Sequence, residues 1–119
     1  NYVFEFNSNL LDLISSSDIA ITRCGASSTA ELTCSLTPFI AVPLLNSIDD
    51  HQNLNAKYYK DKGCCWILKQ ENFNTENLFN LIIDSIKNKK NLENVRENMK
   101  KNCNKNVYEN IESEIKKII

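Results

Sequence analysis

A strand-to-helix connection around Gly25 holds the residues of this chain that are best suited to bind an anionic ligand. A short apolar run, Ile19–Thr22, precedes a turn at Gly25, and small and hydroxyl residues then open a helix. The first turn of that helix carries no bulky side chain, so a ligand can approach its backbone. Because a helix N-terminus presents unpaired N–H groups and a partial positive charge, this arrangement favours an anion such as phosphate.

A carboxylate about one helical turn further along extends this chemistry to hydroxyl groups. Glu31 can accept hydrogen bonds from two neighbouring hydroxyls, such as the diol of a ribose. An ordinary strand-to-helix connection in an α/β domain is the alternative interpretation. The stretch by itself favours neither.

A second group of polar residues, 49–55, opens a later helix. We expect Asp49 or Asp50 to cap that helix through its carboxylate. Gln52 and Asn55 are three residues apart and therefore share a helix face. Because amides both donate and accept hydrogen bonds, this pair suits the hydroxyl groups of a neutral sugar.

His51 stands next to two aspartates, which raises the alternatives of a metal site and of an acid–base pair. The chain contains no second histidine. Adjacent residues on a helix also do not face each other. We therefore interpret His51 as a surface residue at a helix start.

Composition indicates one domain and disfavours several classes of protein. The 119 residues carry a net charge of −1 and a pI near 5.8, so no electrostatic argument favours nucleic acid as a partner. No run approaches the roughly 18 apolar residues of a membrane span, and no signal peptide is recognisable. Because the chain begins at Asn1 rather than at a methionine, we expect a piece of a longer protein.

The cysteines show no pattern of a disulfide framework or of a zinc site. Their number is odd, their spacing is irregular, and no C-x-x-C pair occurs. We therefore expect reduced thiols in a cytosolic protein. The five residues are Cys24, Cys34, Cys64, Cys65 and Cys103.

Alternating strand and helix patterns predict an α/β fold with a Rossmann-like parallel sheet and flanking helices. Strands are expected at Tyr2–Phe6, Ile19–Thr22, Phe39–Val42 and Cys64–Leu68, and the third is apolar throughout, as is typical of a strand buried on both faces. Helices are expected at Leu10–Ser16, about Ser27–Ser35 and about Asp50–Lys62, where Gly63 ends the last. A helical tail follows. Its first helix starts at Thr75, the second is marked by apolar residues from Leu92 to Met99, and the last by apolar residues from Val107 to Ile118.

Polar residues gather in the three loops that leave the first three predicted strands. These loops are Asn7–Asn9, Arg23–Ser28 and Leu44–Gln52. Ligands of parallel α/β sheets bind beyond the carboxyl ends of the strands. We therefore expect one binding edge that brings the loops together.

Three motifs in this order resemble the C-terminal domain of family-28 glycosyltransferases of the GT-B type, the bacterial N-acetylglucosaminyltransferases of peptidoglycan synthesis. The resemblance covers essentially the whole chain. The motifs are Arg23–Glu31 (RCGASSTAE), Pro38–Pro43 (PFIAVP) and Asp49–Ala56 (DDHQNLNA).

This resemblance implies an activity. The family transfers GlcNAc from UDP-GlcNAc to the 4-hydroxyl of MurNAc in lipid I, the undecaprenyl-diphosphate-linked acceptor, and so forms lipid II. It works by inversion at the cytoplasmic face of the bacterial membrane, without a cofactor, and the absence of an Asp-x-Asp motif from this sequence agrees with chemistry that needs no metal.

The resemblance also assigns roles to residues. Asn7 falls where the family holds uracil through backbone groups, although the family usually has an apolar residue there. Glu31 matches the carboxylate that binds ribose, and Gln52 matches the amide that reads the GlcNAc hydroxyls. Arg23, His51 and Asn55 match motif positions with less defined roles. The donor-binding turn and helix start correspond to Gly25, Ala26, Ser27, Ser28, Thr29 and Ala30.

Two parts of the family pattern are missing from these 119 residues. The family has an earlier glycine-rich loop that helps to hold the diphosphate, and an N-terminal domain that carries the acceptor site and the general base. We therefore expect a partial C-terminal domain, residues 1–119, that binds the donor, contains no catalytic residue and is inactive alone. One alternative is another GT-B UDP-sugar transferase, such as the small subunit of the eukaryotic GlcNAc transferase, which works with a separate membrane partner. The other is a non-enzymatic nucleotide-binding α/β module.

Overall fold

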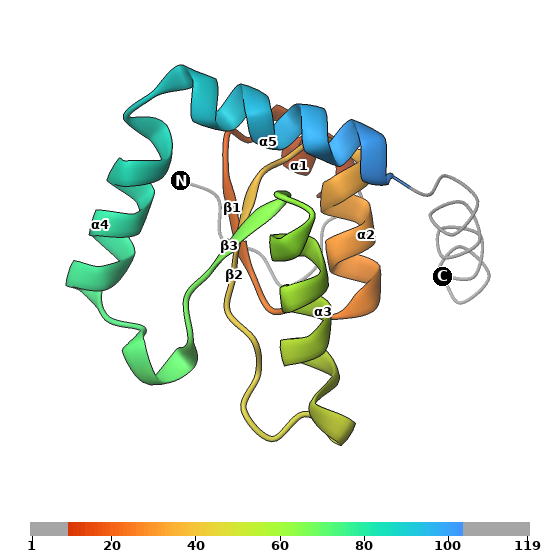
Figure 1. Ribbon diagram of the computed structural model, residues 1–119, viewed down its shortest axis with the longest axis vertical. Helices are drawn as coiled ribbons and strands as arrows, with labels where there is room; N and C mark the ends of the chain where they lie inside the picture. Colours follow the sequence, from red (N-terminus) through yellow and green to blue (C-terminus); the bar gives the residue numbers. More distant parts are fainter. Residues whose placement is uncertain (1–9, 104–119) are drawn as a thin grey trace.

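The structure of the protein is a computed structural model that describes residues 10–103 as a parallel sheet with helices on both faces (Figure 1). The three strands are β1 (Ala20–Thr22), β2 (Phe39–Ala41) and β3 (Cys65–Ile67). The five α-helices of this part of the chain are α1 (Leu10–Ser16), α2 (Ala26–Cys34), α3 (His51–Asp61), α4 (Thr75–Ile86) and α5 (Lys89–Asn102). Two short 3₁₀ turns, η1 (Ile48–Asp50) and η2 (Gln70–Asn72), precede α3 and α4.

The sheet confirms the predicted parallel topology. Its strand order is β1-β2-β3, and both pairings are parallel. The register is in step, because Thr22 lies opposite Ala41 and Ala41 lies opposite Ile67. The predicted strand Tyr2–Phe6 and the predicted last helix Val107–Ile118 lie outside the described residues.

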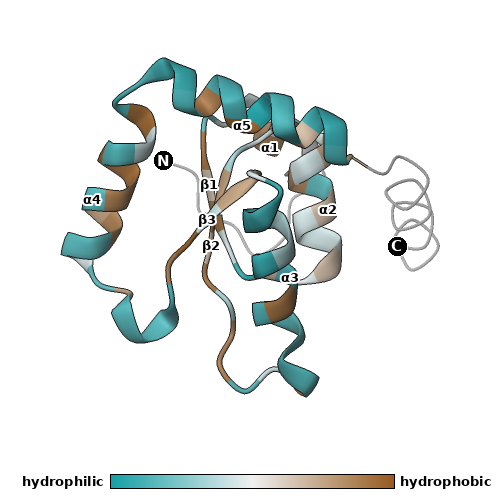
Figure 2. Cartoon of the chain, viewed as in Figure 1, coloured by the Kyte–Doolittle hydropathy of each residue, from teal (hydrophilic) through white to brown (hydrophobic). Residues whose placement is uncertain are grey.

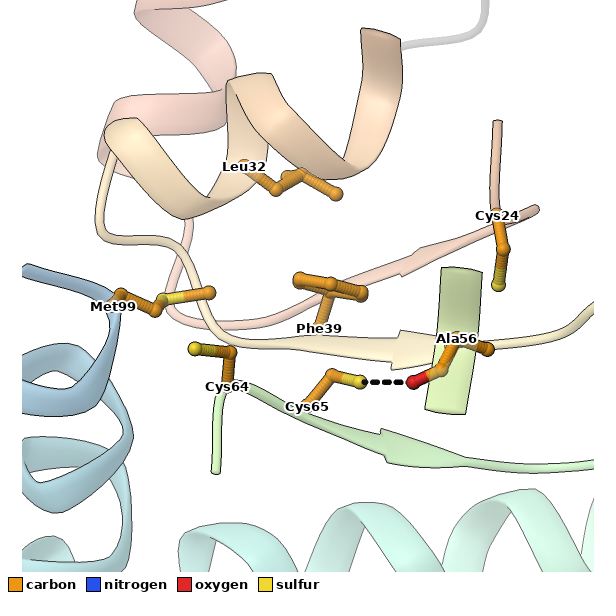
Figure 3. Close-up of a cluster of buried hydrophobic side chains, with 8 residues drawn as sticks. Cys24, Leu32, Phe39, Ala56, Cys64, Cys65 and Met99 are labelled. Carbon is orange, nitrogen blue, oxygen red and sulfur yellow. Dashed lines mark hydrogen bonds between the residues drawn. The ribbon is translucent and has the colours of Figure 1, made fainter. Parts of the chain in front are cut away.

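The central strand β2 is buried on both faces, as its apolar sequence predicts. All three of its residues have no exposed surface. Phe39 packs into a cluster with Leu32 of α2 and Met99 of α5, whereas Ile40 belongs to a second cluster on the opposite face. Figure 3 shows the Phe39 ring facing Leu32, with Met99 to one side and Ala56 to the other. A helix layer on each side of the sheet is therefore obligatory.

The layers divide the helices as Figure 1 shows, with α2 and α3 on one side of the sheet and α4 on the other. Leu78, Leu81 and Ile82 of α4 pack against the Ile40 cluster. The apolar residues of α4 form a stripe along the helix (Figure 2), and part of it stays exposed, at Phe79 and Ile83. An exposed apolar stripe of this kind indicates a surface that can contact another protein segment.

One cysteine pair departs from the prediction of reduced thiols. Cys34 and Cys103 form a disulfide, with their Cα atoms 4.9 Å apart. The prediction is wrong for this pair because α2 and α5 pack together and bring their C-terminal ends side by side, 69 residues apart in sequence. In a reducing compartment the same juxtaposition exists as two adjacent thiols. Cys24, Cys64 and Cys65 are free and buried, as expected of reduced thiols.

Gly63 ends α3 as predicted, and its conformation explains why a glycine stands there. Its φ of +74° is in the left-handed region, which glycine adopts readily because it has no Cβ. A Cβ at this position would also collide with Nδ2 of Asn98 in α5. That amide donates a hydrogen bond of 3.2 Å to the Gly63 carbonyl, which ties the end of α3 to α5.

Gly63→Ala is expected to lower the free energy of unfolding by at least about 1–2 kcal/mol, the usual left-handed penalty, with the collision adding to it. Urea denaturation at pH 7 measures the change. Gly25→Ser is the matched control at the other glycine, because Gly25 has an ordinary φ of −66° and a Cβ there would meet no atom within 4 Å. Equal stability of the two variants would contradict this account.

Candidate functional site

A cavity of about 550 Å³ opens at the carboxyl end of the sheet, between the loops that follow β1 and β2 and the start of α3. It brings two of the predicted polar segments together. A cavity of equal volume lies on the other side of α3, but its mixed lysine and acidic lining includes none of the predicted site residues. The lining of the first cavity is Cys24, Gly25, Ala26, Leu44, Asn46, Ser47, Ile48, His51, Gln52 and Asn55.

The N-terminus of α2 forms one wall of this cavity. Gly25 is its N-cap residue, and no side chain caps the helix. The backbone of Gly25 is extended, a conformation that any residue can adopt, so glycine is not needed here for its backbone freedom. Its lack of a side chain instead leaves the space in front of the helix open. Ala26 lines the cavity, and Ser27 and Ser28 are exposed. The uncapped first turn can therefore present N–H groups to an anion.

Two amide side chains of α3 bind the backbone of both loops. Oε1 of Gln52 accepts hydrogen bonds from the N–H groups of Leu44, at 2.8 Å, and Cys24, at 3.3 Å. Nδ2 of Asn55 donates to the carbonyl of Cys24, at 2.9 Å, and to Oγ1 of Thr29, at 2.8 Å. Oε1 of Gln52 is thus occupied by protein N–H groups, so only Nε2 of this amide is left to bind the predicted sugar.

Thr29 is a buried member of this network. It has no exposed surface, so its side chain cannot contact a ligand directly. Its hydroxyl accepts from Asn55 and lies 3.0 Å from the Gly25 carbonyl, to which it donates. A residue predicted to bind substrate thus instead links α3 to the cap of α2.

The remaining predicted residues lie elsewhere. Glu31 is partly buried in the second turn of α2 and is not part of the cavity lining. Ala30 lines a different, smaller cavity beside the Cys34–Cys103 disulfide. Arg23 points away to donate to Oε1 of Gln70, at 2.6 Å. Asn7 lies outside the described residues.

At the start of α3 the predicted aspartate cap is absent, and Ser47 makes a hydrogen bond that the sequence did not predict. Asp50 occupies the N-cap position in a left-handed conformation, and its side chain makes no capping bond, so the prediction of an aspartate cap is wrong. Its carboxylate instead accepts from Nδ2 of Asn53, at 2.6 Å. The hydroxyl of Ser47 accepts from the backbone N–H of Gln52, at 3.3 Å. The role of Ser47 was not predicted from the sequence, because a serine five residues before the residue it binds does not have the spacing of a usual helix cap.

His51 forms an exposed pair with Asp49. Their closest atoms, Nε2 and Oδ2, are 4.0 Å apart, and the side chains are 72% and 84% exposed. An exposed pair of this kind contributes little energy. Within residues 10–103 no cluster of three His, Cys, Asp or Glu side chains could hold a metal ion.

Cys24 lies in the cavity wall as an inert thiol. It is 1% exposed, and burial raises its pKa to about 11 although the nearby Arg23 lowers it. Burial likewise raises the pKa of Cys64 to about 11 and that of Cys65 to about 12. A nucleophilic cysteine needs a lowered pKa, so these thiols have a packing role.

Comparison with known proteins identifies the class. Residues 1–113 match the glycosyltransferase family 28 C-terminal domain, and the chain belongs to this family. The chain superimposes on the crystal structure of MurG from Acinetobacter baumannii with a TM-score of 0.74, at 26% identity, over 94% of this chain and 33% of that one. The resemblance inferred from the three motifs is thereby confirmed.

Relatives from bacteria carry one descriptive name, "UDP-N-acetylglucosamine--N-acetylmuramyl-(pentapeptide) pyrophosphoryl-undecaprenol N-acetylglucosamine transferase". The protein from Pelagibacter ubique is 39% identical over 88 residues, which are 74% of this chain and 25% of that protein. The protein from Rickettsia felis is 40% identical over 98 residues, 82% of this chain and 27% of that protein. The chain spans about a quarter of the length of these relatives.

The raised thiol pKa values predict a loss of stability at alkaline pH. Below pH 9 each thiol is protonated in the folded and the unfolded state alike. Above pH 9 the unfolded chain releases these protons, while the folded chain keeps them to about pH 11, so rising pH favours unfolding. The urea midpoint is therefore expected to fall from pH 9 to pH 11.

Cys65→Ala should make this fall shallower. The double variant Cys34→Ala/Cys103→Ala is the control, because disulfide cysteines do not titrate and the slope should stay as in the wild type. A slope that Cys65→Ala leaves unchanged would show that this buried thiol is not the cause.

Proposed function

We propose that this chain is part of the donor-binding domain of a transferase that moves GlcNAc from UDP-GlcNAc to lipid I and so forms lipid II. The names of its relatives supply this donor and this acceptor. The observation that carries the proposal is the cavity at the carboxyl end of the sheet, where the open N-terminus of α2 meets the amide side chains of α3.

In this proposal the diphosphate of the donor lies against the first turn of α2. The N–H groups there, from Ala26 onward, stabilise the negative charge that grows on the leaving UDP as the bond to the sugar breaks. Nε2 of Gln52 donates to a hydroxyl of GlcNAc inside the cavity. The ribose would lie outside the cavity lining, further along α2, where Glu31 binds its hydroxyls. A base outside this chain takes the proton of the acceptor hydroxyl. The acceptor oxygen then attacks the anomeric carbon of GlcNAc from the face opposite UDP, so the new glycosidic bond forms with inversion as UDP leaves.

The proposal also assigns the chain its place in a larger protein. Residues 1–119 would supply part of a C-terminal domain, and the acceptor site and the general base would lie in the additional length that the relatives have. The protein would act at the cytoplasmic face of the bacterial membrane, where the acceptor's lipid is anchored. Among residues 10–103, no helix has the length and apolar character needed to cross a bilayer.

Titration of the natural polypeptide that contains this chain with UDP-GlcNAc tests the proposal. We expect saturable binding to UDP-GlcNAc and to UDP, and release of UDP when a soluble lipid I analogue is added. Absence of binding to both nucleotides in a folded protein would refute the proposed function. Hydrolysis of UDP-GlcNAc without transfer to the analogue would refute the acceptor assignment.

Gly25→Ser is expected to weaken UDP binding at least about tenfold while the protein stays as stable as the wild type. The new side chain enters the space in front of α2 that a phosphate would occupy, and its hydroxyl can occupy the N–H groups of the first turn. Calorimetric titration with UDP measures the affinity, and urea denaturation checks the fold. Wild-type affinity in this variant would exclude the α2 N-terminus as the phosphate site.

A further inference from the structure

Both backbone polar groups of Cys24 are held by side chains of α3. Its N–H donates to Oε1 of Gln52, and its carbonyl accepts from Nδ2 of Asn55. Cys24 is 1% exposed and directly precedes the N-cap of α2. Because buried backbone groups without partners are costly, these two amides decide which conformation of the turn is stable.

Each of the two amide side chains, Gln52 and Asn55, uses one of its polar atoms to bind the protein and leaves the other one free of protein partners among the described residues. Asn55 directs its Nδ2 at two protein acceptors, the Cys24 carbonyl and Oγ1 of Thr29. Gln52 accepts two N–H groups at its Oε1, one from each loop. Within the described residues, Nε2 of Gln52 and Oδ1 of Asn55 have no hydrogen-bond partner, so only these two amide atoms are available to a ligand.

We propose that Gln52 and Asn55 are positioning residues that fix the N-terminus of α2 for its ligand, with Thr29 as the buried link between Asn55 and the Gly25 carbonyl. This inference rests on the proposed function, since it takes UDP as the ligand. A turn that is held before the ligand arrives pays no ordering cost on binding. The hydrogen-bonded set of Gln52, Asn55, Thr29 and the Cys24 backbone is called the amide clamp below.

Two buried threonines of α2 allow a matched test of this role. Thr29 and Thr33 are one helical turn apart, have 0% and 1% of their surface exposed, and each donates its hydroxyl to the carbonyl four residues earlier. Of the two, Thr29 is the residue that accepts from Asn55. Neither lines the cavity, so any effect of these side chains on a ligand is indirect.

Thr29→Val is therefore expected to weaken UDP binding at least about threefold, whereas Thr33→Val leaves the affinity unchanged. Both variants are made in the natural polypeptide that contains this chain. Their urea midpoints are compared first, because a purely structural role would lower stability in both without separating their affinities for UDP. Equal affinity of the two variants would overturn the proposal.

A second pair of variants tests the amide clamp without any ligand. Gln52→Ala removes the oxygen that holds the N–H groups of Cys24 and Leu44, whereas Gln52→Glu retains it. Amide hydrogen exchange at these two residues is expected to accelerate at least about tenfold in Gln52→Ala and to stay near the wild-type rate in Gln52→Glu. Exchange that is slow in both variants would overturn the clamp.

The two experiments separate this inference from the proposed function. If the wild type does not bind UDP, the proposed function fails, and the proposal that the clamp positions a nucleotide site fails with it. The exchange rates still decide whether the amide clamp holds the turn. If the wild type binds UDP and Thr29→Val binds it equally well, the proposed function stands and the positioning role falls.

Discussion

The structure depends on the complete burial of β2. A parallel strand with no exposed surface on either face must have a helix layer on each side. This requirement places α2 and α3 against Phe39 and Ala41, and α4 against Ile40. The start of α3 then lies beside the turn before α2, which is the condition for the amide clamp. A site made of short loops thus gets its rigidity from the apolar strand at the centre of the sheet.

Much of the fold follows from local patterns in the sequence. The bounds of α1 and the start of α4 agree with the prediction, because each has an apolar face at helical spacing. The predicted strands are one to two residues too long. The difference is small, since Val42 and Leu68 still donate hydrogen bonds to the neighbouring strand, to Thr22 and Ala41. Gly63 is identifiable because a left-handed helix end favours glycine, although α2 ends with Leu36 in the same left-handed region, at a φ of +57°.

The site is only partly predictable from the sequence. Motif spacing locates the two segments that line the cavity. It does not show that Thr29 is buried, or that the oxygen of Gln52 faces the protein, because these facts depend on the distance between α3 and the turn after β1. The disulfide escapes prediction for the same reason, since it joins the ends of two helices that only tertiary packing brings together.

The in-step register of the strands has a consequence for how such a site can change. Because Thr22, Ala41 and Ile67 lie side by side, the loops that follow them start at one level, with neighbouring strands about 4.8 Å apart. The carboxyl edge of the sheet therefore supports the three loops from one level, and how far each loop extends depends on its own length and sequence. The loop that follows β2, residues 44–50, is exposed along most of its length and includes three left-handed residues, Asn46, Asp49 and Asp50. Selection can thus alter ligand preference by remodelling one loop, while the buried strands beneath it keep their packing.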